Sequence, residues 1–453
     1  MVKVRFAPSP TGYLHVGNTR TALANYLFAR KENGILVLRI EDTDMERSDT
    51  AYEASILEDL RWLGISWEEG PFRQSERIQT YRTYIDVLLE KGDAYKCFCS
   101  KERLEEIKAL SVRRGEPPRY DGTCRNLSGE AVHRMESEGK PYVVRFRSPR
   151  RAVRFTDLIH GETFFPDDHV DDFILLKQEL TPSYNFAVTV DDMLMEITHV
   201  IRGSDHLSNT PKQILLFQAL DRTPPQYAHH SLLTGPDRRP LSKRHGATQV
   251  REFRDIGILP AVLANYVAII GRKVKKEIME RDEMINTFTV KSLSSSDSLF
   301  DMGKLFWFNK EYIRNMPVEN LLGASDIPPK YRDEVVILQE NSKTLAELKE
   351  YLDIFDGTDI KDDGIAYLSA FGDLTAVVAA MDGLPLDGGL TFDDIVKEME
   401  HGTGLTKRDL FMVLRIILTG RKSGPPLKEV FPLLKKDTVT KRMLCLKRQF
   451  SLS

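Results

Sequence analysis

The chain has 453 residues and a net charge of -3, with 41% hydrophobic and 29% charged residues. This composition is ordinary for a globular protein, the length suggests about three domains, and no apolar run approaches the roughly 18 residues that a membrane span needs. Four cysteines do not make a disulfide framework, and bulk charge does not announce a nucleic-acid partner, so any basic surface must be local.

The amino-terminal segment reads as alternating strands and helices. Residues 2–7 alternate like a strand, residues 18–31 have apolar side chains at helical spacings, Gly34 ends that helix, and residues 35–40 form a short buried strand. This order is a βαβ unit, and it predicts a parallel sheet. Because the first strand begins at once, without an apolar signal core, we expect a cytoplasmic protein.

The pattern changes twice along the rest of the chain. Helical spacings cover 51–63 and 77–91, after which cysteines and strand-like runs interrupt the first pattern. Strand and helix signals of the first type return at 195–203 and 210–219. From about residue 250 the chain reads as almost entirely helical, with helices expected at 260–270, 342–352, 366–381, 392–400 and 407–418.

The loop between the first strand and the first helix, residues 8–18, is a candidate nucleotide site. Ligands of open α/β sheets bind at the carboxyl ends of the strands, and a helix start offers free N–H groups to phosphate. Gly17 would let an adenine stack on its backbone, and His15 would contact phosphates unless it is only a solvated loop histidine. The usual dinucleotide and Walker motifs are missing from this loop.

Two signatures in this chain resemble those of the class I aminoacyl-tRNA synthetases. RFAPSPTGYLHVGNTRTA, residues 5–22, is similar to the first signature, and RIEDTDMERS, residues 39–48, looks like the glutamyl branch. PLSKR, residues 240–244, resembles the second signature, where Lys243 matches the lysine that neutralises ATP phosphates. Pro240 replaces the first lysine of that signature, which is a departure from the family pattern.

The resemblance implies a glutamate–tRNA ligase, which activates L-glutamate with ATP and Mg²⁺ and transfers it to the 3′ end of tRNA(Glu), with tRNA(Gln) left open. It implies that His15 and Lys243 act in catalysis. The implied ATP-binding residues are His15, Gly17, Asn18, His206, Lys243 and Arg244. The implied glutamate-binding residues are Arg5, Ala7, Ser9, Glu41, Tyr184 and Arg202.

The chemistry of glutamate fits three of these residues. Glutamate carries two carboxylates and one ammonium, so a selective pocket needs cationic side chains and one anion. Arg5, Glu41 and Arg202 each stand at the end of a predicted strand. The resemblance implies that the two arginines bind carboxylate and that Glu41 binds the α-ammonium. A single strand-end charge is usually a surface residue, but the joint placement favours a pocket.

Three of the four cysteines have a metal-like spacing. Cys97 and Cys99 lie one residue apart and Cys124 follows, but Asn126 stands where many relatives have a histidine ligand and is a poor ligand for zinc. Some relatives use a tyrosine placed like Tyr120 instead. The expected ligands of one structural Zn²⁺ are therefore Cys97, Cys99, Tyr120 and Cys124, with three free thiols as the alternative.

The expected fold is a Rossmann-type α/β catalytic domain with an α+β insertion, followed by an all-α anticodon-binding domain. We expect a monomer that binds tRNA and no membrane. The tail from Lys435 to Arg448 holds six basic residues and one acidic, which favours a tRNA-binding face over a merely solvated helix. The predicted boundaries are 1–80 and 191–250 for the catalytic domain, 81–190 for an acceptor-end-binding insertion, 251–310 for a helical stem-contact segment and 311–453 for the anticodon domain.

Four rival functions remain to be weighed. A glutaminyl-tRNA synthetase usually has a different first loop and a β-barrel carboxyl half. A short paralogue that glutamylates a modified tRNA base lacks an anticodon domain. A small nucleotidyltransferase would not need the long helical half, and a non-catalytic tRNA-binding relative tends to lose His15 or Lys243, which are both present.

Overall fold

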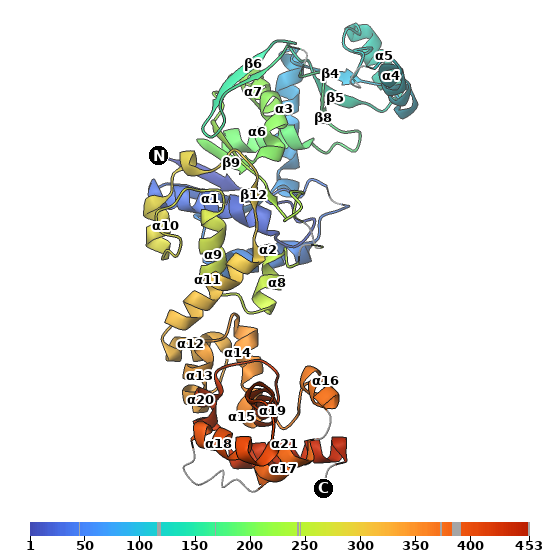
Figure 1. Ribbon diagram of the computed structural model, residues 1–453. Coiled ribbons are helices and arrows are strands. Elements are labelled where there is room, and N and C mark those ends of the chain that lie inside the picture. The colour runs from blue at the N-terminus through green and yellow to red at the C-terminus, as the bar shows by residue number, and fades with distance from the viewer. Residues whose placement is uncertain are drawn as a thin grey trace. The chain divides into compact units, whose positions relative to one another are not determined.

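The computed structural model describes residues 1–451 except 45, 116–118, 168, 242–243, 245, 372–373 and 383–390. The chain divides into two compact units, which are Met1–Glu252 with Leu263–Asp301, and Phe253–Val262 with Met302–Ser453. Two helices, Val250–Asp255 (α8) and Pro260–Ile269 (α9), lie where the chain passes from one unit to the other. Figure 1 shows strands in the first unit and helices throughout the second.

The first unit is built on parallel strands. The predicted βαβ unit is confirmed, because β1 (Lys3–Phe6) and β2 (Ile35–Ile40) pair in parallel and α1 (Val16–Lys31) connects them. β3 (Glu69–Arg73) pairs in parallel with β2, and β10 (Gln226–His230) pairs in parallel with β9 (His199–Gly203). A hydrogen bond from Thr198 N to Lys3 O, 2.9 Å long, joins the starts of β9 and β1.

This strand order is that of a doubly wound sheet. The parallel strands run β3, β2, β1, β9, β10, and β6 (Val153–Asp157) continues them, followed by the antiparallel β7 (Gly161–Phe165). The chain reverses its direction of travel across the sheet between β1 and β9. Ligands of such folds bind at this switch point, outside the carboxyl ends of the strands.

Smaller elements surround this sheet. A three-stranded antiparallel sheet consists of β4 (Ala94–Cys97), β5 (Val143–Phe146) and β8 (Ile174–Leu176), and β11 (Leu233–Thr234) pairs with β12 (Ser298–Leu299). The other α-helices of this unit are α2 (Thr50–Trp62), α3 (Ile78–Glu90), α4 (Lys101–Arg113), α5 (Gly129–Ser137), α6 (Tyr184–Leu194), α7 (Thr210–Ala219) and α10 (Arg281–Thr287). The shared core includes Val37, Phe186, Val200 and Leu216, which are buried side chains from the sheet and its covering helices.

The second unit is helical and has its own core. Its helices are α11 (Met302–Asn315), α12 (Val318–Ser325), α13 (Arg332–Gln339), α14 (Leu345–Tyr351), α15 (Asp353–Asp356), α16 (Asp362–Phe371), α17 (Thr375–Asp382), α18 (Phe392–Thr403), α19 (Lys407–Thr419), α20 (Leu427–Val430) and α21 (Lys436–Phe450). Buried side chains from α16 to α21, including Leu368, Ile395 and Leu414, form one cluster. These helices therefore share a hydrophobic core of their own.

One helix prediction was wrong. The single helix expected over 366–381 is two helices, α16 and α17. The sequence between them contains Gly372, which lies outside the described residues, and glycine costs about 1 kcal/mol in a helix interior. The spacing of apolar residues over 366–381 does not by itself reveal where one helix ends and the next begins.

The length and apolar composition of the described helices bear on membrane crossing. None of them is by itself long and apolar enough to span a bilayer. A bent pair, Asp362–Ala370 with Thr375–Asp382, meets the requirement by length and composition alone.

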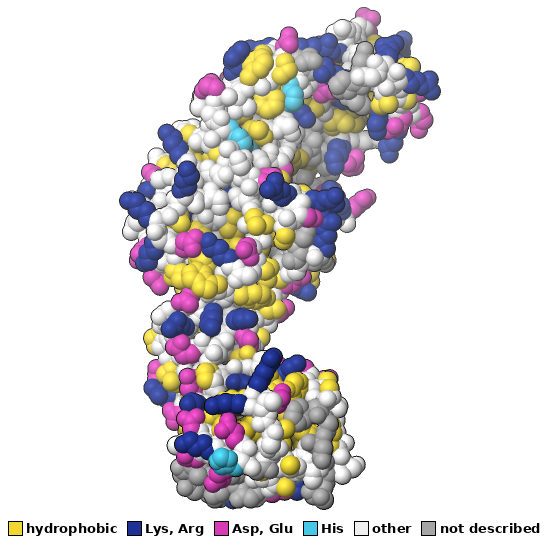
Figure 2. All heavy atoms as spheres, viewed as in Figure 1, with side chains coloured by type: hydrophobic (Ala, Val, Ile, Leu, Met, Phe, Trp, Pro, Cys, Tyr) yellow, Lys and Arg dark blue, Asp and Glu magenta, His cyan; other side chains and the backbone are white. Residues whose placement is uncertain are grey.

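On the face drawn in Figure 2, Lys and Arg side chains lie interspersed with Asp and Glu, in keeping with the net charge of -3.

Candidate active site

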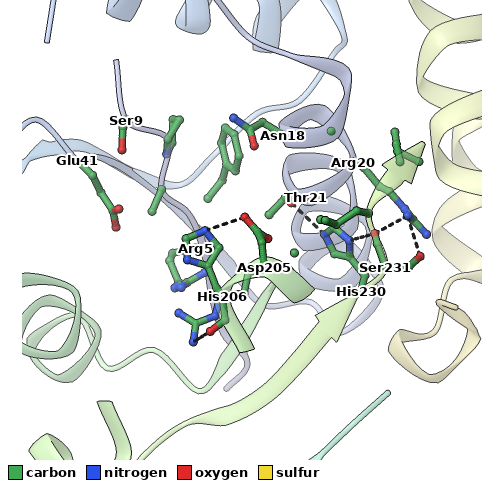
Figure 3. A pocket seen from close by; sticks show the side chains of 18 of the residues that line it. Arg5, Ser9, Asn18, Arg20, Thr21, Glu41, Asp205, His206, His230 and Ser231 are labelled. Atoms are coloured by element: carbon green, nitrogen blue, oxygen red, sulfur yellow. Dashed lines mark hydrogen bonds and ion pairs between the residues drawn. The ribbon is translucent and has the colours of Figure 1, made fainter. Parts of the chain in front are cut away.

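A cavity of about 290 Å³ lies at the switch point of the sheet, beside the carboxyl ends of β1, β2 and β9. In Figure 3, Ser9 and Glu41 lie on one side of it, and Thr21 and His230 lie on the other. Nine of the predicted site residues line this cavity. They are Arg5, Ala7, Ser9, Gly17, Asn18, Glu41, Tyr184, Arg202 and His206. The structure thus brings both arginines and the glutamate of the predicted amino-acid pocket together.

The Arg5 side chain is fixed by a buried acidic partner. Its Nε lies 3.2 Å from Asp192 Oδ1, and no described residue is recorded as accepting from its two Nη groups. Asp192 also accepts from Arg39 Nη1 at 2.8 Å. Burial opposes the charge on Asp192, but Arg5 and Arg39 hold the pKa of its carboxyl below the usual range. Asp192 is therefore an anion that orients Arg5 toward the cavity.

Glu41 belongs to the same charge network. Arg39, which has no exposed surface, donates from Nη2 to Glu41 Oε1 at 3.1 Å. Burial raises the pKa of the Glu41 carboxyl, and the ion pair with Arg39 opposes that shift. One oxygen of Glu41 is thus held by Arg39 while the side chain still lines the cavity, where an ammonium group would stabilise the carboxylate.

Arg202 is a cation of the cavity wall with one buried donor left unpaired among the described residues. Its Nε lies 3.1 Å from His229 Nε2, and its Nη2 lies 2.8 Å from Thr210 Oγ1. Its Nη1 is buried and has no hydrogen-bond partner among the residues that the structure describes. A buried guanidinium N–H without a partner is costly, so this group is suited to an incoming anion.

Two further residues close this side of the cavity. Tyr184 begins α6, and its hydroxyl lies 3.1 Å from His206 Nδ1. Burial raises the pKa of Tyr184 to about 12, so the phenol stays protonated at neutral pH. Burial also lowers the pKa of His206, which is therefore a neutral imidazole. The pair supplies neutral hydrogen-bonding groups beside the charged ones.

His15 stands directly before the first helix, as expected, and its contact with phosphate stays a prediction. It is the N-cap residue of α1, where its Nδ1 accepts from Gly17 N at 3.2 Å, and it is not among the residues that line the cavity. Burial lowers the pKa of His15, so the ring is neutral. With Nδ1 occupied, Nε2 is the atom left for an outside group. The cap also uses one of the N–H groups expected to meet phosphate.

Comparison with known proteins decides the family. The model of the class I tRNA synthetases for glutamate and glutamine, catalytic domain, matches residues 1–307, and an anticodon-binding-domain model matches residues 298–446. The glutamate–tRNA ligase of Sulfurihydrogenibium sp. is 41% identical, with 94% of each chain covered. The chain belongs to the glutamyl-tRNA synthetases. The glutamate–tRNA ligase of Carboxydothermus hydrogenoformans is 39% identical, with 98% of this chain and 99% of the relative covered.

A solved structure agrees with this family. The crystal structure of a glutamate tRNA ligase from Elizabethkingia meningosepticum, in complex with its amino acid, matches with a TM-score of 0.81 and 30% identity. The match covers 98% of each chain. The predicted resemblance to the glutamyl branch and the predicted fold class, an α/β catalytic domain followed by a helical anticodon-binding domain, are confirmed.

The lysine signature of this glutamyl-tRNA synthetase is described only in part. Lys243 lies outside the described residues, so its role stays a prediction. Arg244 is exposed, and its Nη2 lies 2.9 Å from Asp237 Oδ2. Arg244 is not among the residues that line the cavity. Its predicted contact with ATP stays a prediction.

The three predicted metal-ligating cysteines lie together. The sulfur atoms of Cys97, Cys99 and Cys124 all lie within 4.8 Å of one another. The Tyr120 hydroxyl lies 3.3 Å from Cys97 Sγ and 3.4 Å from Cys99 Sγ, and it accepts from Cys124 N at 2.9 Å. Three thiols, which are preferred zinc ligands, thus lie around one phenol oxygen.

Sequence reasoning missed the residues that hold the pocket in place. Asp192 and Arg39 were not predicted, and neither were His229 and its partner Asp157. The signals were weak but present. Asp191 and Asp192 stand side by side in an apolar helix, and Asp157 and His229 stand in short strands, positions where a charged or polar group needs a partner.

Proposed function

We propose that this chain is a glutamate–tRNA ligase. It joins the carboxylate of L-glutamate to the α-phosphate of ATP, releasing diphosphate, and then transfers the glutamyl group to a terminal ribose hydroxyl of tRNA(Glu), releasing AMP. ATP enters with Mg²⁺ on its phosphates, as a substrate. The relatives named above carry the same activity in their names, at about 40% identity over nearly the whole chain.

The observation that carries this proposal is the charge pattern of one cavity. Arg5 and Arg202 are buried cations in its wall, and Glu41 is a buried anion in the same wall. Arg20 is a third buried cation of this wall, and it already donates to the backbone oxygens of Ser231 and Ile270. Arg5, Arg202 and Glu41 complement the two carboxylates and one ammonium of glutamate. Glutamine would present a neutral amide in place of one carboxylate. It would leave a buried arginine N–H without an anionic partner, which costs affinity.

The chain contributes positioning and charge stabilisation and does not supply a nucleophile. The glutamate carboxylate oxygen attacks the α-phosphorus, and the bond to diphosphate breaks as the new bond forms. Gly17 and Asn18 at the start of α1 line the cavity, and backbone N–H groups at this helix start are proposed to meet the phosphates. Lys243 is proposed to neutralise the leaving diphosphate, as in the signature that it matches.

The test is direct charging. Purified tRNA(Glu), tRNA(Gln) and tRNA(Asp) are each incubated with labelled glutamate and with labelled glutamine, in the presence of ATP and Mg²⁺. We expect glutamate on tRNA(Glu), and the outcome with tRNA(Gln) decides whether the enzyme is specific for one tRNA. Esterification of glutamine would identify the rival glutaminyl enzyme. Glutamate on tRNA(Asp), with no label on tRNA(Glu), would identify the paralogue that modifies a tRNA base.

We infer that the cysteine cluster holds one structural zinc ion. Cys97, Cys99, Tyr120 and Cys124 would be its ligands, and the ion would stabilise the fold around them. Metal analysis of protein purified without chelator should give one zinc per chain. Tyr120→Phe should weaken retention of zinc during dialysis against a chelator, and Asn126→Ala should not. Zinc loss in the Asn126 variant alone would refute this choice of fourth ligand.

A further inference from the structure

Arg202 does not stand alone in the sheet. On β9 it lies directly across from His229 on β10, as one of the paired positions of these two parallel strands. The next strand outward, β6, ends at Asp157, which is paired with Tyr227 on β10. Residues 227 and 229 point to the same side of their strand. Three neighbouring strands therefore place Asp157, His229 and Arg202 in a row.

The three side chains are joined by hydrogen bonds. His229 Nδ1 lies 2.6 Å from Asp157 Oδ2, and His229 Nε2 lies 3.1 Å from Arg202 Nε. Asp157 also accepts from the backbone N–H groups of Ile159 and His160, each at 2.9 Å. The carboxylate of Asp157 is thus held firmly, and it faces one nitrogen of the imidazole ring.

The partners fix which nitrogen of His229 carries the proton. A carboxylate accepts, so Nδ1 carries the hydrogen and donates to Asp157. Nε2 then has a lone pair, and two groups lie 3.1 Å from it, Arg202 Nε and the Thr210 hydroxyl. Arg202 Nε is always a donor, so Nε2 is the acceptor of this contact. In the opposite tautomer, His229 Nε2 would carry a hydrogen that points at the N–H of Arg202 Nε, and neither group could accept. Burial lowers the pKa of His229 to about 4, in agreement with a neutral ring at neutral pH.

These contacts leave one face of the Arg202 guanidinium for a ligand. Nε is taken by His229, and Nη2 by Thr210 Oγ1 at 2.8 Å. Nη1 is buried and has no partner among the described residues. His229 and Asp157 have no exposed side-chain surface, and neither lines the cavity. They can therefore affect a ligand only through Arg202.

We propose that Asp157 and His229 are positioning residues that orient Arg202 for the carboxylate of the amino-acid substrate. This proposal rests on the function proposed above and adds two residues to it. A planar guanidinium binds a carboxylate well only when its fork is correctly turned, and an acceptor at Nε fixes the plane. The neutral imidazole does this without adding a second positive charge beside Arg202.

The test uses two substitutions of His229 that keep different halves of the ring. His229→Gln places an amide oxygen near the position of Nε2, so it can still accept from Arg202. His229→Asn keeps a polar atom near Nδ1 but does not reach Arg202. We expect the KM for glutamate to rise about 10- to 100-fold in the Asn variant, the range for losing a hydrogen bond to a charged group, and to stay within a few-fold in the Gln variant. The KM for ATP should not change in either.

Asp157→Asn tests the tautomer. Asparagine can donate to Nδ1, which would shift the proton to Nε2 and turn it against Arg202. We expect a rise in the KM for glutamate that matches that of His229→Asn, with an unchanged KM for ATP. Equal losses for both substrates, together with a lowered melting temperature, would mean that these residues serve only the fold and would overturn the proposal.

A double-mutant cycle with Arg202→Ala separates this proposal from the proposed function. If His229 acts through Arg202, His229→Asn should have no further effect once Arg202 is alanine. If Arg202→Ala leaves the KM for glutamate unchanged, the proposed pocket is wrong. If Arg202→Ala raises it but the Asn variants at 157 and 229 behave like the parent, the pocket stands and the positioning role is refuted.

Discussion

At the scale of single residues, the rate of adenylate formation depends on the side chains that neutralise the charge of the phosphates. Lys243 has the clearest role predicted from the sequence, the neutralisation of the ATP phosphates. Lys243→Ala should slow glutamyl-adenylate formation by a factor of about 10²–10³. The reason is that one preorganised charge stabilises the transition state by roughly 3–4 kcal/mol. Diphosphate exchange that depends on glutamate, measured with tRNA present, gives the rate. Binding of glutamate in the absence of ATP is the control and should be unchanged. Exchange at the parental rate would remove Lys243 from the phosphate site.

Buried histidines give a second prediction at this scale. Burial lowers the pKa of His229 to about 4 and that of His230 to about 3, from an ordinary value of 6.5. The unfolded chain therefore binds protons that the folded chain does not once the pH falls below about 6.5. The catalytic unit should lose stability as the pH falls from 6.5 toward 4, with a slope of about 1.4 kcal/mol per pH unit for each histidine once the pH is well below 6.5.

Urea unfolding between pH 5 and 6.5 measures this slope in a range where most carboxylates hardly titrate. His229→Gln removes one titrating group. The slope of its unfolding free energy against pH should therefore be smaller near pH 5 by about 1.4 kcal/mol per pH unit, the effect of one proton. An identical slope in the parent and the variant would show that His229 is not neutral in the fold, and this result would not depend on whether the enzyme is active.

At the scale of elements, the basic side chains of residues 435–448, predicted to form a tRNA-binding face, do not all point outward. Arg442 on α21 is fully buried, and it donates to the backbone carbonyls of Leu418, Asp353 and Ile354. Lys435 and Lys447 are engaged in ion pairs with acidic residues. The sequence shows the charge of a side chain but not its direction.

Neighbouring positions on this helix give a matched pair of variants. Arg442→Met removes the donor of the buried contacts to the Leu418 and Ile354 carbonyls. It should destabilise the helical unit by roughly 3 kcal/mol or more. Lys441 is exposed and pairs only with Asp437 one turn away, so Lys441→Met should change stability by less than about 0.5 kcal/mol. Thermal unfolding compares the two. Equal losses would mean that the carbonyl contacts of Arg442 contribute little.

At the scale of the whole molecule, the sequence predicted local structure better than it predicted the assembly of the sheet. The βαβ unit and most helices were expected, since their apolar spacings are local. Pairing between β6 and β10 joins residues 153–157 to 226–230. Such pairing depends on the three-dimensional order of strands, which no local pattern records. The Asp157–His229–Arg202 row was invisible for that reason, whereas Arg5 and Glu41 were found because each stands at the end of a recognisable strand.

The last prediction concerns the two units. All residues that line the cavity belong to the first unit, and the second unit has its own core. A chain cut after Asp301 should therefore still bind glutamate and ATP. The segment Phe253–Val262 belongs to the second unit, where Leu259 N donates to Asn309 Oδ1 at 2.8 Å. The cut removes that partner and exposes buried apolar side chains, so we also expect the fragment to be less soluble.

The same fragment should bind tRNA poorly. Residues 298–446 match an anticodon-binding domain, and their loss removes phosphate contacts as well as any contact with unstacked bases. The affinity for tRNA(Glu) should fall, and the dependence of the binding constant on salt should become less steep, because fewer counterions are released. Calorimetry with glutamate shows that the fragment is folded, and filter binding at several salt concentrations gives the slope. Equal affinity and equal slope with and without the helical unit would mean that recognition of tRNA lies entirely in the first unit.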